Sequence, residues 1–348
     1  MATRSKGDVL VALVNREPAI SEDTWRSFWT RVRERDLRAG EAAAVIASLS
    51  TSAPDAASLG AMFSTLRERH EHPSQALPGT VNIVGTGGGP RTFNLSTAAA
   101  FVAATIGARV IKTGSRAYTS GRGSIDLLDS IGVPLASSYA QTEAMVQEHG
   151  IACAGHFVYA PELRLLARSV LPLDIRSVGR FFNAFGPWLG AVPVAAQVTG
   201  ISDPALHASF RQLALDATDR RVMLCWNAAG VDELLSFEEN VVYDGDADRE
   251  LHVTPDSLGL AAGTMEDMRP VEDDVVVGHF LDLLCGRGTP AAIDSIALNA
   301  AMLAVACKAA PDFRVALAAA RASLHEGRPR QLVERIRMPQ RQARALVG

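Results

Sequence analysis

A glycine-rich segment at residues 85–97, GTGGGPRTFNLST, is the first candidate for binding chemistry. Its glycines allow backbone N–H groups to approach a ligand, and the segment leads into a predicted helix whose N-terminus carries partial positive charge. The residues of this first loop that could bind an anion are Gly85, Thr86, Gly87, Gly88, Asn94, Ser96 and Thr97. The pattern predicts a phosphate or pyrophosphate site. Two alternatives stay open: Ser96 or Thr97 serves only as a helix cap, or the whole loop is a structural turn.

The first loop matches neither common nucleotide motif. A dinucleotide fingerprint requires a carboxylate about 20 residues further on, where this chain has Val110, Ile111 and Lys112. A P-loop requires Gly-Lys-Ser/Thr, which the loop lacks. Both of these motifs are therefore disfavoured, and the first loop by itself is only a weak indication of a phosphate site.

A second loop, KTGSRAYTSGRGS at residues 112–124, combines cations with glycines and hydroxyls. Its candidate binding residues are Lys112, Gly114, Ser115, Arg116, Thr119 and Gly123. Cationic side chains neutralise phosphate charge, and hydroxyls and the N-terminus of a following helix donate hydrogen bonds. Two anion sites in one crevice favour a ligand that carries phosphate at both ends. The alternative is a solvated surface turn with exposed arginines.

A third loop, NAAGVDEL at residues 227–234, contributes the adjacent carboxylates Asp232 and Glu233. A magnesium ion held mainly by substrate oxygens uses one or two carboxylates and keeps waters. The alternative is that the two acidic residues begin a helix, where they suit the dipole.

The elements that position these loops are predicted from hydrophobic periodicity. Residues 1 to about 72 have only helical spacing, and a Pro- and Gly-containing segment places a domain boundary near residue 77. Short apolar runs at 81–84, 108–112, 151–158, 195–201 and 221–226 then alternate with helical stretches, and residues 273–347 return to helices. Such alternation predicts an α/β fold with a mainly parallel sheet flanked by helices. The three loops follow predicted strands, so we expect them along one edge of the sheet.

Composition excludes several functional classes. The chain has 348 residues, 48% of them hydrophobic, with a net charge of −4. The acidic balance argues against non-specific nucleic-acid binding, and no apolar stretch reaches the ~20 residues of a membrane span. Four cysteines without a CxxC pair indicate neither a zinc cage nor a disulfide framework. We expect a cytoplasmic protein with small-molecule partners.

Longer segments carry a resemblance to a known family. GTGGGPRTFNLSTAAAFVAATIGARVIKTGSR resembles the phosphoribosyl-diphosphate-binding stretch of anthranilate phosphoribosyltransferases, where the pattern is close to GTGGD, NxST and KHGNR. The likeness continues through AYTSGRGSIDLLDSIGV, FVYAPELR, RFFNAFGPW, AGVDELL, HVTPDSLGL and ALNAAMLAVACKA, and so covers nearly the whole chain.

The resemblance implies a small helical domain, residues 1–77 joined in space by helices from about 172–190, and a large α/β domain, residues 78–171 and 191–348. It implies a homodimer, magnesium as cofactor, and attack of an acceptor nitrogen on ribose C1 of phosphoribosyl diphosphate with release of pyrophosphate. By this likeness Lys112, Asp232 and Glu233 are catalytic, and Ser96, Asp232 and Glu233 hold magnesium. Fixed N–H donors and Lys112 would stabilise the charge that develops on the leaving pyrophosphate.

Departures from the family pattern gather in the acceptor half. Gly89 stands where the family has Asp, Thr113 where it has His, and Ser115 where it has the Asn that faces anthranilate. Asp174 aligns with an arginine that meets the anthranilate carboxylate, and Arg176 is the nearest compensating cation. Because an aspartate repels a carboxylate, we predict a phosphoribosyltransferase for anthranilate or for another small aromatic acceptor. Two alternatives remain: a nucleoside phosphorylase, and a non-catalytic relative that binds nucleic acid.

Overall fold

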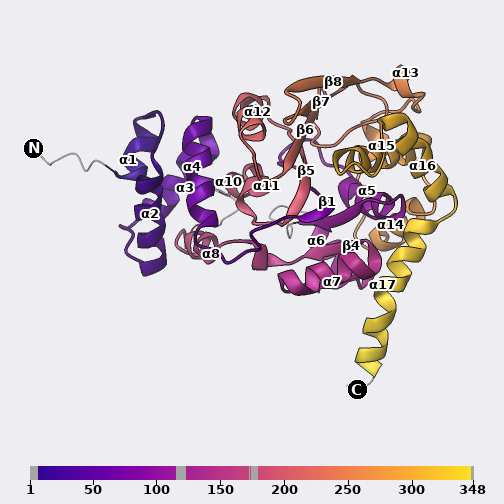
Figure 1. Cartoon of the computed structure of the whole chain (residues 1–348), viewed down its shortest axis with the longest axis horizontal. Coiled ribbons are helices and arrows are strands. Elements are labelled where there is room, and N and C mark those ends of the chain that lie inside the picture. The colour runs from indigo at the N-terminus through magenta and orange to yellow at the C-terminus, as the bar shows by residue number, and fades with distance from the viewer. Residues whose placement is uncertain (1–6, 115–122, 172, 174–178, 346–348) are drawn as a thin grey trace, which may run out of the picture.

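The computed structural model describes residues 7–114, 123–171, 173 and 179–345, with side chains up to residue 337. At the N-terminus it has only helices, as predicted: α1 (Val9–Val14), α2 (Glu22–Glu34), α3 (Glu41–Thr51) and α4 (Ala56–Arg67). Asp8, Ser21 and Asp55 accept hydrogen bonds from the first turns of α1, α2 and α4, which explains where these helices begin. The four helices lie together at one end of the molecule (Figure 1).

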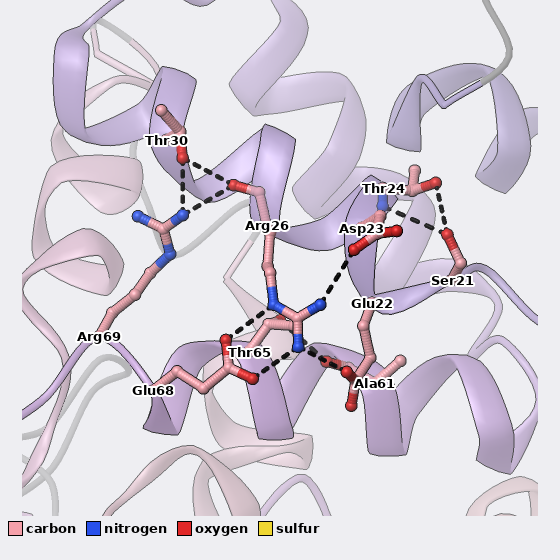
Figure 2. A network of polar contacts seen from close by, with 10 residues as sticks. All are labelled: Ser21, Glu22, Asp23, Thr24, Arg26, Thr30, Ala61, Thr65, Glu68 and Arg69. Carbon is pink, nitrogen blue, oxygen red and sulfur yellow. Dashed lines mark hydrogen bonds and ion pairs between the residues drawn. The ribbon is translucent and has the colours of Figure 1, made fainter.

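The packing of α2 against α4 combines an apolar face with a polar network. Trp25 and Trp29 are fully buried and stack at 5.8 Å between ring centroids. On the outer side, Arg26 forms two hydrogen bonds with Glu68 at the end of α4, at 2.7 and 2.8 Å, and one with Glu22 at 2.6 Å (Figure 2). Because this network is partly exposed, the aromatic burial supplies most of the stabilisation, at about 2–3 kcal/mol per large side chain.

One sheet contains the strands of the described residues. They are β1 (Leu77–Ile83), β2 (Arg109–Lys112), β3 (Leu135–Ala136), β4 (Ile151–Ala154), β5 (Val194–Gly200), β6 (Arg221–Asn227), β7 (Asn240–Asp244) and β8 (Arg249–Val253), in the order β3-β4-β2-β1-β5-β6-β7-β8. The first six strands in this order pair in parallel, whereas β7 and β8 are antiparallel. The predicted α/β class and mainly parallel sheet are therefore confirmed.

Helices pack against the sheet. They are α5 (Leu95–Thr105), α6 (Ser124–Ile131), α7 (Tyr139–His149), α8 (Pro161–Arg168), α10 (Arg180–Ala184), α11 (Gly186–Leu189), α12 (His207–Leu215), α13 (Pro255–Leu258), α14 (Val276–Leu283), α15 (Pro290–Ala306), α16 (Phe313–His325) and α17 (Arg328–Ala345). The described residues also form the short 3₁₀ segments η1 (His156–Val158), η2 (Pro204–Leu206) and η3 (Met265–Met268). In Figure 1, α5, α15 and α16 lie at the end of the molecule opposite α1–α4.

Two local predictions from the sequence are wrong. The apolar run at 151–158 ends as a strand at Ala154: the bond from Gly155 N–H to the Ala136 carbonyl follows the last β3–β4 pair, and His156–Val158 then forms a 3₁₀ turn. The helix α5 has Asn94 at its N-cap position, without a side-chain capping bond, whereas Ser96 and Thr97, the predicted caps, lie inside its first turn.

Buried apolar side chains of the described residues form separate clusters. Those of α1–α4 form one cluster with side chains of α8, α10 and α11 and also of α12, β6 and β7, whereas α5, α15 and α16 pack on the sheet in another. The exact division of the chain into two domains stays a prediction. Within the described residues, none of the helices combines the length and the apolar character needed to cross a membrane.

Candidate active site

The first loop follows β1 and stays beside β5. Thr86 N–H donates to the Gly200 carbonyl at 3.0 Å, so the backbone turns only after this point. Gly87 and Gly88 then adopt φ of 61° and 85°, the left-handed region that glycine enters without strain. A Cβ on Gly85 would lie 1.9 Å from Asp232 Oδ2, so only glycine fits there. The glycines therefore serve both a turn and a close approach to the third loop.

The acidic pair of the third loop binds N–H groups of the first loop. Asp232 Oδ2 accepts from Gly87 N–H at 2.7 Å. Glu233 Oε1 accepts from Ser96 N–H at 3.0 Å, and Glu233 Oε2 accepts from the Thr92 hydroxyl at 2.7 Å. The structure thus brings the first and third loops together, although they are more than 130 residues apart in sequence.

Buried asparagines hold the acidic pair in place. Asn227 Nδ2 donates to the Glu233 carbonyl at 2.9 Å. Asn299, on α15, accepts from Leu234 N–H at 3.0 Å and donates to the Leu234 carbonyl at 2.7 Å. Because these side chains satisfy the loop backbone, residues 231–238 form no helix, and the prediction that Asp232 and Glu233 begin one is wrong.

The remaining candidates on α5 differ in their surroundings. The Asn94 side chain makes no capping hydrogen bond, although Asn94 occupies the N-cap position. Ser96 is partly buried, and its N–H is the donor to Glu233. Thr97 is fully buried, and its Oγ1 has no hydrogen-bond partner among the described residues. An orphaned hydroxyl beside the first loop is consistent with a ligand that would satisfy it.

Lys112, the last residue of β2, is 3% exposed. Its Nζ lies 3.5 Å from the Ile83 carbonyl at the end of β1. Burial lowers the pKa of Lys112 from 10.5 to about 8, and the charges of Glu233 and Asp232 oppose this change. Burial likewise raises the pKa of Asp232, and it raises that of Glu233 to about 7 with help from the neighbouring Asp232 charge. The site therefore holds one cation and two carboxyl groups at an electrostatic cost that a charged ligand would relieve.

The two ends of the second loop belong to the described residues. Gly114 lies so close to Ser124 that a Cβ would be 2.1 Å from its Oγ, and Gly123 N–H donates to Asp126 Oδ2 at 3.0 Å at the start of α6. The predicted site residues Ser115, Arg116, Thr119, Asp174 and Arg176 lie outside the described residues.

Two further residues of the site, Thr92 within the first loop and Ser202 beside it, were not predicted from the sequence. Thr92 binds Glu233, as described above. Ser202, after β5, donates its N–H to Thr86 Oγ1 at 3.1 Å, and its hydroxyl donates to the Gly87 carbonyl. A hydroxyl residue at the carboxyl end of another parallel strand was the available signal. Gly89 also has a structural reason: a Cβ there would lie 2.1 Å from the Gly230 carbonyl oxygen, so an aspartate does not fit without movement of the third loop.

The carboxylates of the acidic pair supply only part of the coordination that a hard divalent cation needs. Asp232 and Glu233 offer carboxylate oxygens of the kind magnesium prefers. Among the described residues, no group of three or more His, Cys, Asp or Glu side chains could hold a metal ion. Two carboxylates alone leave most of an octahedral shell to water or to substrate oxygens, which is how magnesium binds phosphate substrates.

Comparison with known proteins identifies the family of the chain. Residues 77–330 match the family model described as "Glycosyl transferase family, a/b domain". An anthranilate phosphoribosyltransferase of Roseiflexus sp. (strain RS-1) is 32% identical over 326 residues, covering 88% of this chain and 94% of the relative. One from Chloroflexus aurantiacus is also 32% identical, covering 85% of this chain and 93% of the relative. The chain belongs to the anthranilate phosphoribosyltransferase family.

Solved structures agree with membership of this family. The anthranilate phosphoribosyltransferase of Thermus thermophilus matches with a TM-score of 0.81 and 27% identity, covering 95% of this chain and 98% of that chain. The Saccharomyces cerevisiae enzyme, solved in complex with PRPP and Mg, shares the fold with a TM-score of 0.76 and 20% identity. As a member of the anthranilate phosphoribosyltransferase family, the chain is an enzyme, a glycosyltransferase of the pentosyltransferase class. The comparisons favour neither a nucleoside phosphorylase nor a nucleic-acid-binding relative.

Proposed function

We propose that this protein transfers 5-phosphoribosyl from phosphoribosyl diphosphate to the nitrogen of a small aromatic acceptor and releases pyrophosphate. The observation that carries the proposal is that Gly87 N–H and Ser96 N–H each bind an oxygen of the acidic pair. Both N–H groups are thus directed at anionic oxygens, at the end of a glycine loop and in the first turn of α5. Phosphate oxygens of the donor have the same requirement.

The same residues account for magnesium binding. We propose that Asp232 and Glu233 hold the ion together with Ser96 and phosphate oxygens of the donor, as a family relative solved with PRPP and Mg supports. When bound, the ion would neutralise charge on the departing pyrophosphate. The carboxylates would then release Gly87 N–H and Ser96 N–H to the donor.

Lys112 and the loop N–H groups supply the rest of the charge stabilisation. Negative charge grows on pyrophosphate as the bond to ribose C1 breaks, and fixed donors in a buried site stabilise such charge without reorganising. Lys112 provides the ammonium, and Thr86 and Thr97 add hydroxyls from the first loop and α5. No covalent nucleophile is needed, because the acceptor nitrogen attacks C1 directly.

A finer proposal concerns the acceptor. The relatives at 32% identity are anthranilate phosphoribosyltransferases, which makes anthranilate the first acceptor to consider. Thr113, Ser115 and Asp174 nevertheless depart from the family pattern, and Asp174 would repel a carboxylate. We propose that an aromatic amine without that carboxylate competes well with anthranilate. The homodimer and the cytoplasmic location also remain proposals.

Pyrophosphate release with a panel of acceptors tests both levels of the proposal. The purified chain, with phosphoribosyl diphosphate and magnesium, is assayed with anthranilate, with aniline and without acceptor. We expect pyrophosphate release to depend on the acceptor. The ratio of kcat/KM for aniline to kcat/KM for anthranilate should be higher for this chain than for a family member that has His and Asn at the positions of Thr113 and Ser115. If neither anthranilate nor aniline causes release of pyrophosphate, the proposed phosphoribosyl transfer is contradicted. A strong preference for anthranilate would contradict only the proposal of an altered acceptor.

A further inference from the structure

The side chain of Ser202 holds one peptide group of the first loop. Its hydroxyl donates to the Gly87 carbonyl, and Ser202 N–H donates to Thr86 Oγ1 at 3.1 Å. The Thr86 hydroxyl also faces the Gly87 carbonyl, but at 3.5 Å. Ser202 is thus the nearer of the two hydroxyl donors to this carbonyl.

Packing does not fix the turn that Gly87 and Gly88 make. Both residues are exposed, and both have positive φ, of 61° and 85°. Apart from their chain neighbours, a Cβ on either residue would meet no atom closer than 3.8 Å. Because glycine enters many backbone conformations without steric cost, the peptide between them can turn over unless a hydrogen bond holds it. The Ser202 hydroxyl supplies such a bond.

The orientation of this peptide decides where Gly88 N–H points. In a planar trans peptide, the carbonyl and the N–H that follows it point in opposite directions. Because the Gly87 carbonyl faces Ser202, Gly88 N–H faces away from Ser202, in an exposed part of the loop. Among the described residues this N–H has no hydrogen-bond partner, whereas Gly87 N–H is bound to Asp232. Gly88 N–H is therefore ready to bind an anion.

The neighbours of Ser202 in the chain are themselves anchored. Ile201 is 1% exposed, and its N–H donates to the Cys225 carbonyl at 2.8 Å, which continues the pairing of β5 with β6. On the other side, Asp203 Oδ1 accepts from Ala205 N–H at 3.0 Å at the start of η2. Because both neighbours are held, Ser202 can orient the first loop rather than follow its movement.

We propose that Ser202 is a positioning residue for the phosphates of the donor: its hydroxyl keeps the Gly87–Gly88 peptide turned so that Gly88 N–H binds a phosphate oxygen. The inference rests on the proposed function, because it takes the first loop as the site of phosphoribosyl diphosphate. Unlike Gly87 N–H and Ser96 N–H, this N–H needs no release from the acidic pair. Ser202 acts through the peptide and does not itself contact the donor.

Substitutions at Ser202 separate positioning from general stability. Ser202→Ala removes the hydroxyl but keeps the N–H bond to Thr86, so the peptide becomes free to turn over. Ser202→Thr keeps a hydroxyl and is the rescue variant. Ser257→Ala is the matched control, because the exposed Ser257 hydroxyl also donates to a backbone carbonyl, that of Thr254, at 2.8 Å.

Calorimetric titration of inorganic pyrophosphate and of phosphoribosyl diphosphate, each with magnesium, measures the effect on binding. We expect Ser202→Ala to raise both Kd values about tenfold, as the loss of one hydrogen bond to a charged oxygen predicts. Ser202→Thr should restore both values to within about threefold of the wild type, because the hydroxyl bond is kept. Ser257→Ala should bind like the wild type. Equal affinities of Ser202→Ala and the wild type would overturn the inference.

Crystal structures of the wild type and Ser202→Ala without ligand show the peptide directly. The Gly87 carbonyl should face residue 202 in the wild type and should have turned away in Ser202→Ala. An unturned peptide in Ser202→Ala would refute the role of Ser202 even if the chain is an active phosphoribosyltransferase. A turned peptide with weakened pyrophosphate binding, in a chain that transfers no phosphoribosyl group, would support the positioning and reject the proposed function. A wild type that binds neither pyrophosphate nor the donor would contradict both.

Discussion

Replacing Lys112 by methionine should stabilise the free protein and abolish binding of the donor. Lys112 is 3% exposed, and burial lowers its pKa from 10.5 to about 8. One pH unit corresponds to ~1.4 kcal/mol, so keeping this ammonium charged in the folded protein costs about 3 kcal/mol below pH 8. Methionine has a similar shape and no charge. The free energy of unfolding at pH 7 should therefore rise by about 3 kcal/mol in Lys112→Met.

The pH dependence of this difference follows from the lowered pKa. Between pH 8 and pH 10.5 the folded chain loses the Lys112 proton before the unfolded chain does, so the wild type gains stability with rising pH. Below pH 8 both states are protonated and the full penalty remains. The advantage of Lys112→Met should shrink from about 3 kcal/mol at pH 7 to less than about 0.5 kcal/mol near pH 10.5.

Urea denaturation at pH 7, 8, 9 and 10.5 measures this difference directly. Lys308→Met is the matched control, because Lys308 is exposed at the end of α15, and its free energy of unfolding should follow the wild type at every pH. A Lys112→Met variant that is less stable than the wild type at pH 7, or a stability difference that does not change with pH, would refute a buried, charged Lys112.

Three further outcomes follow from the contacts of the acidic pair. Gly85→Ala should weaken binding of phosphoribosyl diphosphate with magnesium at least tenfold in calorimetry, because the new Cβ would lie 1.9 Å from Asp232 Oδ2; wild-type affinity would show that the carboxylate can move freely. Asn299→Leu should lower the free energy of unfolding by about 2 kcal/mol in urea, because it leaves the buried N–H and carbonyl of Leu234 unpaired; an unchanged midpoint would contradict this. Burial raises the pKa of Glu233 from 4.5 to about 7. Between these pH values the unfolded chain loses the Glu233 proton before the folded chain does, so the free energy of unfolding falls as pH rises. Magnesium affinity should increase between pH 6 and pH 8, because Glu233 becomes a carboxylate over this range. A pH-independent magnesium affinity, measured by titration in the presence of donor, would exclude Glu233 as a ligand.

The sequence predicted the parts of the fold that periodicity encodes. The helical N-terminal region, the parallel strands and the helix that begins at Ser124 agree with the structure because their apolar spacing and caps are local properties. The hairpin of β7 and β8 was missed because β8, with the sequence RELHV, is mostly polar, although Asp244-Gly245 is a turn signal. The two-residue strand β3 is too short to give any pattern.

The candidate site was predicted as residue types but not as contacts. Asp232 and Glu233 were recognised by their adjacency, but their bonds to the first loop depend on strand order, which the sequence does not specify. The alternative that they begin a helix failed because Asn227 and Asn299 bind the loop backbone. Long-range side-chain contacts of this kind, like that of Ser202 with Gly87, leave no periodic signal.

Calorimetric titration of phosphoribosyl diphosphate into the full chain, with and without magnesium, shows whether the loops around Lys112 and the acidic pair bind the donor. The wild type and Lys308→Met should bind the donor with the same affinity and should bind it more tightly with magnesium, whereas Lys112→Met should show no binding. Equal binding by Lys112→Met and the wild type, or no binding by the wild type with magnesium present, would contradict the assignment of these loops to the donor.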